Sequence, residues 1–215
     1  MLILNVPYAE KDEAKSLGAK WNPALKKWTY SYRKNYIQIL RWLPEYQENS
    51  LLSAWRLSIA CDNLCIVEAN RTCFKCTNYI SVIGFSYDFI LNFYGDFNII
   101  KDSEYDNDLH IGSPDSNTPQ YILDEVSQSF NFKKMYSKTT QSAYYANFCP
   151  YCKTLQGNFH LFNDSDGPFY ITNKESASKL KVHKIKLKND FVLHDDTSWS
   201  STDYLIKKHA LFVGN

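Results

Sequence analysis

The sequence contains two short cysteine motifs, CFKC at residues 73–76 and CPYC at residues 149–152, and these motifs decide the fold of most of the chain. In each motif, the gap of two residues allows one tight turn to direct two sulfur atoms at a single point. Two such turns supply four thiolates in the tetrahedral arrangement that Zn²⁺ prefers. The predicted ligands of this Zn²⁺ are Cys73, Cys76, Cys149 and Cys152.

The two motifs are farther apart in the sequence than in a compact zinc ribbon, so we expect a split ribbon with an insertion between its two turns. Residues 147–158, NFCPYCKTLQGN, resemble the second turn of zinc-ribbon proteins, although Lys153 stands where such proteins usually carry glycine. A four-thiolate site leaves no position for water. The predicted Zn²⁺ is therefore structural.

Two other interpretations of these cysteines are a redox pair and unligated core residues. A thioredoxin-like redox protein uses one such motif at the start of a helix, whereas this chain has two motifs between predicted strands. Cys61 and Cys65 stand upstream of the first motif. We expect both to be buried as small hydrophobic residues, and the alternative is a spare ligand or a redox switch.

The residues around the motifs predict a larger α+β domain over residues 61–215. Apolar residues before Cys73 and after Cys76 predict two strands that flank the first turn. Residues 88–125 are rich in acidic side chains and include SPDSNTP, so we expect an exposed acidic loop or insertion there. Over residues 179–188, lysines alternate with apolar residues, which predicts an amphipathic strand whose lysines protect a sheet edge or contact phosphates.

Residues 1–46 form a separate predicted module. A short apolar run ends at Pro7, and the acidic residues that follow favour the first turn of a helix. Two aromatic segments around residues 22–23 predict a hairpin, and apolar residues recur at helical spacing over residues 36–43. The expected order is strand, helix, hairpin and helix, followed by a connector over residues 47–60.

The run LNVPYAEKDEAKSLGAKWNPALKKWTY, residues 4–30, resembles a small domain of unknown function that recurs in plasmid and phage proteins. In those proteins the domain stands beside primase, antirestriction and relaxase modules. The positions that carry the resemblance are Pro7, Glu10, Lys11, Ala14, Lys15, Gly18, Trp21 and Trp28. Asn22 departs from the pattern, because Asp is commoner there. No biochemical role is assigned to this domain, so the resemblance implies only an association with DNA-handling systems.

Charge is unevenly distributed along the chain. The formal net charge of +1 excludes binding to nucleic acid by bulk charge alone, but residues 1–46 carry an excess of basic residues interleaved with aromatic ones. This composition favours contact with phosphates and stacking on bases. The predicted nucleic-acid contacts are Lys20, Lys26, Lys27, Arg33 and Lys34. We expect Trp21 and Trp28 to form the module's core, because so small a unit needs large side chains to have one. For the lysines two interpretations stay open: they contact nucleic acid, or they only keep the module soluble.

The overall composition, with 44% hydrophobic and 22% charged residues, is typical of a soluble globular protein. It excludes a disordered chain, a collagen-like repeat and a coiled coil. No window approaches the ~20 apolar residues of a membrane-spanning helix, and the first residues lack the features of a secretory signal. We therefore expect a cytoplasmic protein that does not contact a membrane.

His160 lies shortly before Asp164 and Asp166, and a histidine with two nearby carboxylates suggests a hydrolytic metal site. The simpler interpretation, which we favour, is that His160 lies on one face of a strand and that a turn follows it. The sequence contains no nucleophile elbow, phosphate-binding loop or HExxH motif. We therefore assign no catalytic residue.

These observations together predict an α+β protein with a small strand–helix–hairpin–helix module and a larger domain built on a split four-cysteine zinc ribbon. The expected function is that of a non-enzymatic zinc-binding protein in a DNA-associated bacterial or mobile-element system, which contacts nucleic acid through its N-terminal module. One alternative is a protein-interaction or regulatory protein, such as a toxin–antitoxin component, whose acidic segment binds a basic partner. A further alternative is a metal-dependent hydrolase or nuclease.

Overall fold

The computed structural model describes residues 1–44, 56–96, 99–194 and 200–214. The described residues are mostly strands with few helices, and they confirm the α+β class. Contacts divide the chain into two compact units, each of which is discontinuous in sequence. The first unit comprises Met1–Asp62, Phe89–Asn107 and Lys186–His194. The second unit comprises Asn63–Asp88, Asp108–Ile185 and Asp195–Asn215.

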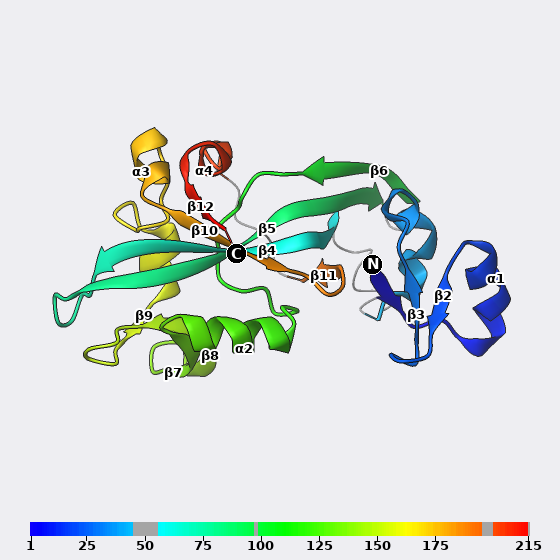
Figure 1. The fold of residues 1–215 in the computed structure, drawn as a ribbon, viewed down its shortest axis with the longest axis horizontal. Helices are drawn as coiled ribbons and strands as arrows, with labels where there is room; N and C mark the ends of the chain where they lie inside the picture. The colour runs from blue at the N-terminus through cyan, green and yellow to red at the C-terminus, as the bar shows by residue number, and fades with distance from the viewer. Residues whose placement is uncertain (45–55, 97–98, 195–199, 215) are drawn as a thin grey trace. The chain divides into compact units, whose positions relative to one another are not determined.

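The first unit begins with a module that has the predicted order of strand, helix, hairpin and helix (Figure 1). Its elements are β1 (Leu2–Leu4), η1 (Tyr8–Glu10), α1 (Lys11–Ser16), β2 (Lys20–Asn22), β3 (Lys27–Tyr30) and η2 (Arg33–Trp42). The three strands form an antiparallel sheet in the order β1-β3-β2. Gly18, with a φ of 99°, follows the helix α1 in a left-handed conformation that glycine adopts without steric cost.

The pairing register of this sheet determines which residues face the core. Leu2 pairs with Tyr30, Leu4 pairs with Trp28, and Trp28 also pairs with Trp21. Residues directly opposite each other point to the same face of a sheet. Trp28 packs against the buried cluster, but Trp21 lies on the edge strand β2 and is 52% exposed. The prediction that both tryptophans form the core is therefore wrong for Trp21.

A larger sheet contributes strands to both units. Its order is β12-β10-β4-β5-β6, and β11 also pairs with β4. The strands are β4 (Arg56–Thr72), β5 (Tyr79–Asp96), β6 (Ile99–Asp106), β10 (Lys181–Lys186), β11 (Phe191–Leu193) and β12 (Leu211–Val213). Of these, β4 and β5 are long enough to contribute residues to the first and to the second unit.

The acidic segment at residues 88–125 is not the exposed loop that we expected. It contains the end of β5, the whole of β6 and the start of the helix α2 (Gln120–Ser129). β5 and β6 pair in an antiparallel register, and Ile90 and Leu91 of β5 are buried. The apolar residues between the acids are sufficient to form strands, and the number of acids concealed this pattern.

The second unit adds a small antiparallel sheet and several short helices. These elements are β7 (Phe132–Ser137), β8 (Ser142–Phe148), β9 (Leu155–Gln156), the π-helical turn η3 (Phe159–Asn163), α3 (Lys174–Ser178) and α4 (Tyr204–His209). The helix α2 lies beside β7, and α3 lies beside α4 (Figure 1). The core of this unit is a buried apolar cluster that includes Cys65, Val67, Leu180 and Ile206.

The lysine-rich strand β10 is not an edge strand, contrary to our interpretation of residues 179–188. β12 pairs with it in parallel, with Leu211 opposite Lys181, and β4 lies on its other side. Lys184 Nζ lies 2.8 Å from Asp88 Oδ2, and Lys207 Nζ of α4 lies 3.2 Å from the other carboxylate oxygen. Asp88 therefore joins β5, β10 and α4 through ion pairs.

Candidate metal centre

The first cysteine motif lies in a tight turn between β4 and β5. The N–H of Cys73 donates a hydrogen bond to the carbonyl oxygen of Asn78 at 2.8 Å, and the N–H of Thr77 donates to the carbonyl oxygen of Cys73 at 3.0 Å. These two bonds close the turn. The structure also confirms the prediction that strands flank this motif on both sides.

The second motif lies between β8 and β9 and repeats the same backbone pattern. The N–H of Cys149 donates to Thr154 and the N–H of Lys153 donates to Cys149, both at 2.9 Å. Lys153 has a φ of 60°, and Thr77, at the equivalent position of the first turn, has a φ of 58°. Glycine adopts this left-handed conformation most easily. The geometry therefore explains why glycine is usual at the position of Lys153.

The two turns bring the four predicted ligands together. All four sulfur atoms lie within 4.8 Å of one another. Cys73 Sγ lies 3.8 Å from Cys152 Sγ, and Cys76 Sγ lies 3.6 Å from Cys149 Sγ. In a tetrahedron with Zn–S bonds of about 2.3 Å, adjacent sulfur atoms are about 3.8 Å apart. Two of the sulfur–sulfur distances therefore match this value, and all four sulfur atoms are close enough to share one ion.

The sulfur atoms also have polar neighbours that suit metal-bound thiolates. Asn78 Nδ2 donates to Cys76 Sγ at 3.3 Å, and Gln156 Nε2 donates to Cys73 Sγ at 3.5 Å. Gln156 is fully buried, so its amide is held beside the sulfur atom. Amide donors of this kind orient the ligands of a metal and stabilise their negative charge.

The thiols differ in their tendency to ionise. Burial raises the pKa of Cys73, but hydrogen bonds from the backbone N–H groups of Cys76 and Lys75 outweigh it and leave that pKa below its ordinary value. Hydrogen bonds from Thr154 lower the pKa of Cys152 to about 6, whereas burial raises the pKa of Cys149 to about 11. Within the second turn, Cys152 therefore ionises at a lower pH than Cys149.

The cluster could therefore bind one metal ion. Four thiolates are soft ligands and favour Zn²⁺ or iron. Because all four positions of a tetrahedron are taken by sulfur, the site has no place for water or substrate. Structural Zn²⁺ sites are closed in this way.

Cys61 and Cys65 lie outside this cluster. Both are fully buried, which confirms the prediction that they act as small hydrophobic residues. Burial raises the pKa of Cys65 to about 12 and raises that of Cys61 further still. Both thiols are therefore protonated at neutral pH, which does not favour a role as ligands or redox switches.

His160 lies in the helical turn η3 and not on a strand, so that prediction is wrong. Its side chain is exposed, and its Nδ1 lies 3.2 Å from Asp164 Oδ2. In the part of the chain that the structure describes, the four cysteines are the one group of His, Cys, Asp and Glu side chains close enough to share an ion. His160, Asp164 and Asp166 do not form such a group.

The predicted nucleic-acid contacts are not on one surface. Lys20 and Lys27 lie on the face of the small sheet opposite Trp21 and Trp28, because successive residues of a strand alternate between faces. Lys27 Nζ donates to Asn5 Oδ1 at 2.6 Å. Lys26 lies in the β2–β3 turn, and Lys34 lies on η2, where it is exposed.

Arg33 has a different environment from these lysines. Its guanidinium group lies 2.8 Å from Asp190 Oδ1 and 2.9 Å from Asp62 Oδ1, and Tyr36 donates to Asp190 Oδ2 at 2.6 Å. Asp190 is buried, with a side chain that is 3% exposed. The hydrogen bonds to Asp190 and Asp62 raise the pKa of Arg33. Arg33 therefore holds distant segments of the first unit together.

A second set of side chains in the module was missed by the sequence analysis. We call it the basic–aromatic row, and its members are Tyr8, Lys11, Lys15, Trp28 and Trp21. Lys11 Nζ lies 3.8 Å from the centre of the Tyr8 ring, Lys15 Nζ lies 6.0 Å from the Trp28 ring, and the Trp28 and Trp21 rings are 5.8 Å apart. Lys11 and Lys15 are one helical turn apart on α1, and this spacing was the available signal.

Residues 1–44 match the family described as Domain of unknown function (DUF5710). This match supports the resemblance of the N-terminal module to a small domain of unknown function, and it covers that module alone. Comparisons with curated proteins and with solved structures gave no match for the chain. Among the described residues, no helix is long and apolar enough to cross a membrane.

Proposed function

We propose that this protein is a non-enzymatic nucleic-acid-binding protein whose second unit is stabilised by a structural Zn²⁺. Two separate features support the two parts of the proposal. The closed four-cysteine cluster supports the metal, and the basic–aromatic row supports binding through the N-terminal module.

The metal is assigned as Zn²⁺ because it forms closed tetrahedral sites with four cysteines and needs no further ligand. Cys73, Cys76, Cys149 and Cys152 provide this ligand set, with sulfur atoms within 4.8 Å of one another. Elemental analysis of the full chain should find one zinc per molecule. Iron at the same stoichiometry, or absence of metal after purification without chelators, would contradict the assignment.

The observation that carries nucleic-acid binding is the close contact of rings and ammonium groups along the row. Tyr8 is 82% exposed and Trp21 is 52% exposed, so both rings are available for stacking on bases. Lys11 lies beside the Tyr8 ring and Lys15 beside the Trp28 ring, and both ammonium groups can contact phosphates there. Non-specific binding to single strands combines these two kinds of side chain.

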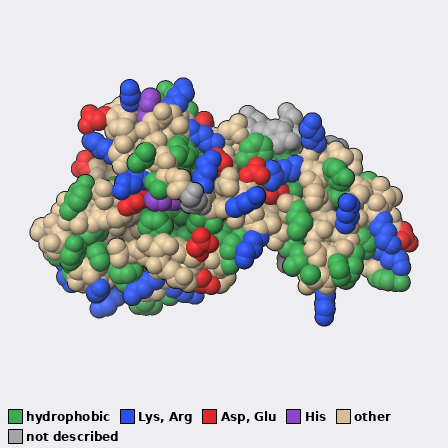
Figure 2. All heavy atoms as spheres, viewed as in Figure 1, with side chains coloured by type: hydrophobic (Ala, Val, Ile, Leu, Met, Phe, Trp, Pro, Cys, Tyr) green, Lys and Arg blue, Asp and Glu red, His purple; other side chains and the backbone are tan. Residues whose placement is uncertain are grey.

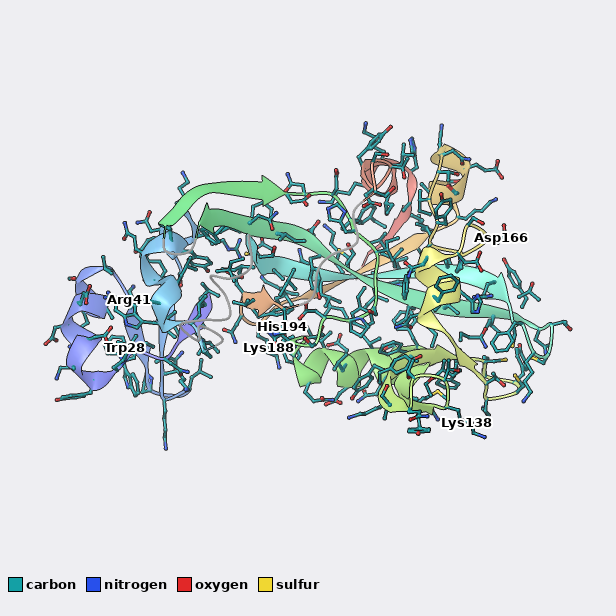
Figure 3. All side chains as sticks on the ribbon, turned by 180° about the vertical axis from the view of Figure 1, so that it is seen from behind. Trp28, Arg41, Lys138, Asp166, Lys188 and His194 are labelled. Atoms are coloured by element: carbon teal, nitrogen blue, oxygen red, sulfur yellow. The ribbon has the colours of Figure 1, made fainter. Side chains whose placement is uncertain are left out.

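The acidic residues of α1 do not cancel this charge. Arg41 of η2 forms ion pairs with Glu13 and Glu10, and Trp42 Nε1 donates to Glu10 Oε2 at 2.6 Å. Figure 3 shows Arg41 and Trp28 within the same module. Lys15 Nζ is 3.5 Å from Asp12, but both side chains are exposed, and such surface pairs are weak. Both lysines of the row thus stay available to phosphates.

Binding of the full chain to a labelled 15-nucleotide oligothymidine, followed by fluorescence anisotropy at several salt concentrations, tests this proposal. Lys11→Glu with Lys15→Glu should weaken binding and reduce the slope of log affinity against log salt by roughly 0.7 for each phosphate that is no longer neutralised. Trp21→Ala should also weaken binding. Tyr32→Ala, which removes a ring that is 59% exposed outside the row, is the matched control.

The same experiment compares the row with the residues that the sequence predicted. Charge reversal at Lys26 and Lys27, on the turn and the opposite face, should have a smaller effect than reversal at Lys11 and Lys15. A larger effect at Lys26 and Lys27 would move the binding surface to the hairpin. No binding by the parent protein at low salt would overturn the nucleic-acid proposal.

A further inference from the structure

A groove with a volume of about 1030 Å³ crosses the second unit beside the metal centre. Its walls come from the first cysteine turn, the loop before α2, α2 itself, the β7–β8 hairpin and residues 155–160. All of these segments belong to the second unit. The groove is therefore separate from the basic–aromatic row of the N-terminal module.

Two exposed phenylalanine rings line this groove. Phe74 lies between the ligands Cys73 and Cys76 and is 61% exposed, and Phe159 lies at the start of η3 and is 62% exposed. A phenylalanine ring has no polar atom that would favour its exposure to water. The turn around the metal centre fixes the backbone of Phe74. The rings therefore form a prepared surface on which a flat ligand can stack.

Exposed lysines line or flank the groove, and so does the exposed carboxylate of Asp124, which follows the lining residue Leu123 and accepts a hydrogen bond from Gln120 Nε2 at 2.8 Å. Lys134 lines the groove and is exposed, and the exposed Lys75 and Lys138 are next in sequence to lining residues. Figure 2 shows lysine and arginine side chains along the edge of the unit that carries β7 and β8. Asp115 also lines the groove, but it is 8% exposed and accepts a hydrogen bond from the N–H of Asn117 at 2.7 Å. An anionic ligand therefore meets little repulsion from Asp115.

The remaining lining residues are rich in hydroxyl groups. Thr139, Thr140 and Ser142 come from the β7–β8 turn, and Thr118 comes from the loop before α2. The Thr118 hydroxyl oxygen is buried, so the accessible hydroxyl groups are those of Thr139, Thr140 and Ser142, which are exposed. Hydroxyl groups are common donors to phosphate oxygens.

We propose that this groove binds a single-stranded nucleic acid of a few nucleotides. The bases stack on Phe74 and Phe159, and the phosphates lie near Lys134 and the hydroxyl groups of the β7–β8 turn. A neutral oligosaccharide would also use rings and hydroxyl groups, but it would not use the lysines. The exposed lysine that lines the groove and the exposed lysines that flank it therefore favour the nucleic acid.

The inference shares its ligand class with the proposed function, but it concerns a different site. The experiment therefore uses the full chain and compares variants of the groove with variants of the row. Phe74→Ala and Phe159→Ala are made singly, and Tyr170→Ala, a ring that is 50% exposed outside the groove, is their control. Lys134→Glu tests the charge, and Lys174→Glu on α3 is its control. Affinity for a labelled 15-nucleotide oligothymidine is measured, together with metal content.

Each phenylalanine variant should bind about 5- to 100-fold more weakly, because one base no longer has a ring to stack on. Phe159→Ala and Lys134→Glu should keep the same metal content as the parent, whereas the controls should bind like the parent. Because Phe159 is not next to a cysteine ligand, its variant keeps the inference testable even if Phe74→Ala loses metal.

Three results would overturn the inference. In the first, Phe159→Ala and Lys134→Glu bind like the parent, whereas the double variant Lys11→Glu/Lys15→Glu binds weakly. This result would leave the row as the binding surface and exclude the groove. Binding of maltohexaose in the groove without binding of oligonucleotides would replace the ligand class. Failure of the parent chain to bind oligonucleotides at low salt would exclude both sites. Conversely, weak binding by the groove variants and parent-like binding by the row variants would contradict only the N-terminal part of the proposed function.

Discussion

In the first unit, the buried carboxylate of Asp190 joins segments that are far apart in the sequence, whereas in the second unit four cysteines from two turns do so. Arg33 and Tyr36 contact Asp190 from within the N-terminal module. The second unit has its own buried apolar cluster, into which Cys73 and Cys149 project. The comparison teaches that one chain can use an ion pair in one core and a cluster of four cysteines in the other. The two units should therefore respond to different perturbations.

Removal of the metal should have the largest effect, and it should act on the second unit. Apparent zinc-binding free energies of about 10–16 kcal/mol in small fingers match the stability of a whole domain. We expect Cys149→Ser, or a strong chelator, to remove hydrogen-exchange protection from β5, β8 and β10 residues of that unit while β1 and β3 stay protected. Mass spectrometry of the exchanged protein measures both regions.

Cys65→Ser is the control for this experiment, since Cys65 is equally buried but lies outside the cluster. It should keep the metal and lose at most about 1–3 kcal/mol of stability for the buried hydroxyl. Equal loss of protection in both units on chelation would show that the metal stabilises the whole chain.

Asp190→Ala should destabilise the first unit by about 3–5 kcal/mol, because it leaves the partly buried Arg33 without its main partner. The metal content should not change. Urea unfolding followed by tryptophan fluorescence measures the loss of stability. Asp12→Ala removes a carboxylate whose pair with Lys15 is exposed, and it should change stability by less than about 1 kcal/mol. Release of metal from Asp190→Ala would contradict the separation of the two units.

Acid should weaken the first unit through the same carboxylate. Burial raises the pKa of Asp190, but hydrogen bonds from Arg33 and Tyr36 outweigh it and hold that pKa below its ordinary value. A lowered pKa in the folded state means that Asp190 stabilises the unit fully above the unfolded pKa of about 3.9. This contribution declines as the pH falls below that value. The unfolding free energy is measured at several pH values for the parent and for Asp190→Asn. As the pH falls, it should decline less in Asp190→Asn than in the parent, because the variant has no carboxylate at this position.

The smallest expected effect is at Lys153, whose φ of 60° is strained for a residue with a side chain. Lys153→Gly should relieve about 1 kcal/mol of strain, and the added freedom of the unfolded chain should offset part of this gain. We expect a net stabilisation of about 0.5 kcal/mol in thermal unfolding. Lys75→Gly, in the first turn but without a positive φ, should instead destabilise the protein. Equal effects at both positions would contradict the role of backbone strain.

The sequence allowed the cysteine cluster and the order of elements in the module to be predicted, because both depend on local spacing. Two residues between cysteines specify a turn, and the turns at Cys73 and Cys149 have the same hydrogen bonds. By contrast, the position of β10 within the sheet depends on its pairing with β4, which is more than 100 residues earlier in the sequence. The composition of residues 179–188 does not show which strands β10 pairs with. In residues 88–125 the pattern of β5 and β6 is present, but the number of acids concealed it.

The functional surfaces were harder to predict for a related reason. The alternation of residues along β2 and β3 places Lys20 and Lys27 opposite Trp21, and this required the pairing register. Arg33 was predicted to contact nucleic acid, but it pairs with Asp190, which is 157 residues away. Likewise, Phe74 and Phe159 line one groove only because the first cysteine turn and η3 meet beside the metal centre. Tertiary contacts of this kind leave no local pattern in a single sequence.

The pairing of Arg33 with Asp190 also sets the order in which the protein can mature on the ribosome. The two residues are 157 positions apart, so at about 5–20 residues per second the arginine waits roughly 10–30 seconds for its partner to be synthesised. β11, which pairs with β4 in the first unit, is made in the same late stage. The metal turns are complete earlier. The unit that begins the chain therefore cannot be completed until Asp190 and β11 have been made, and a chain that stops before residue 190 leaves its first unit open.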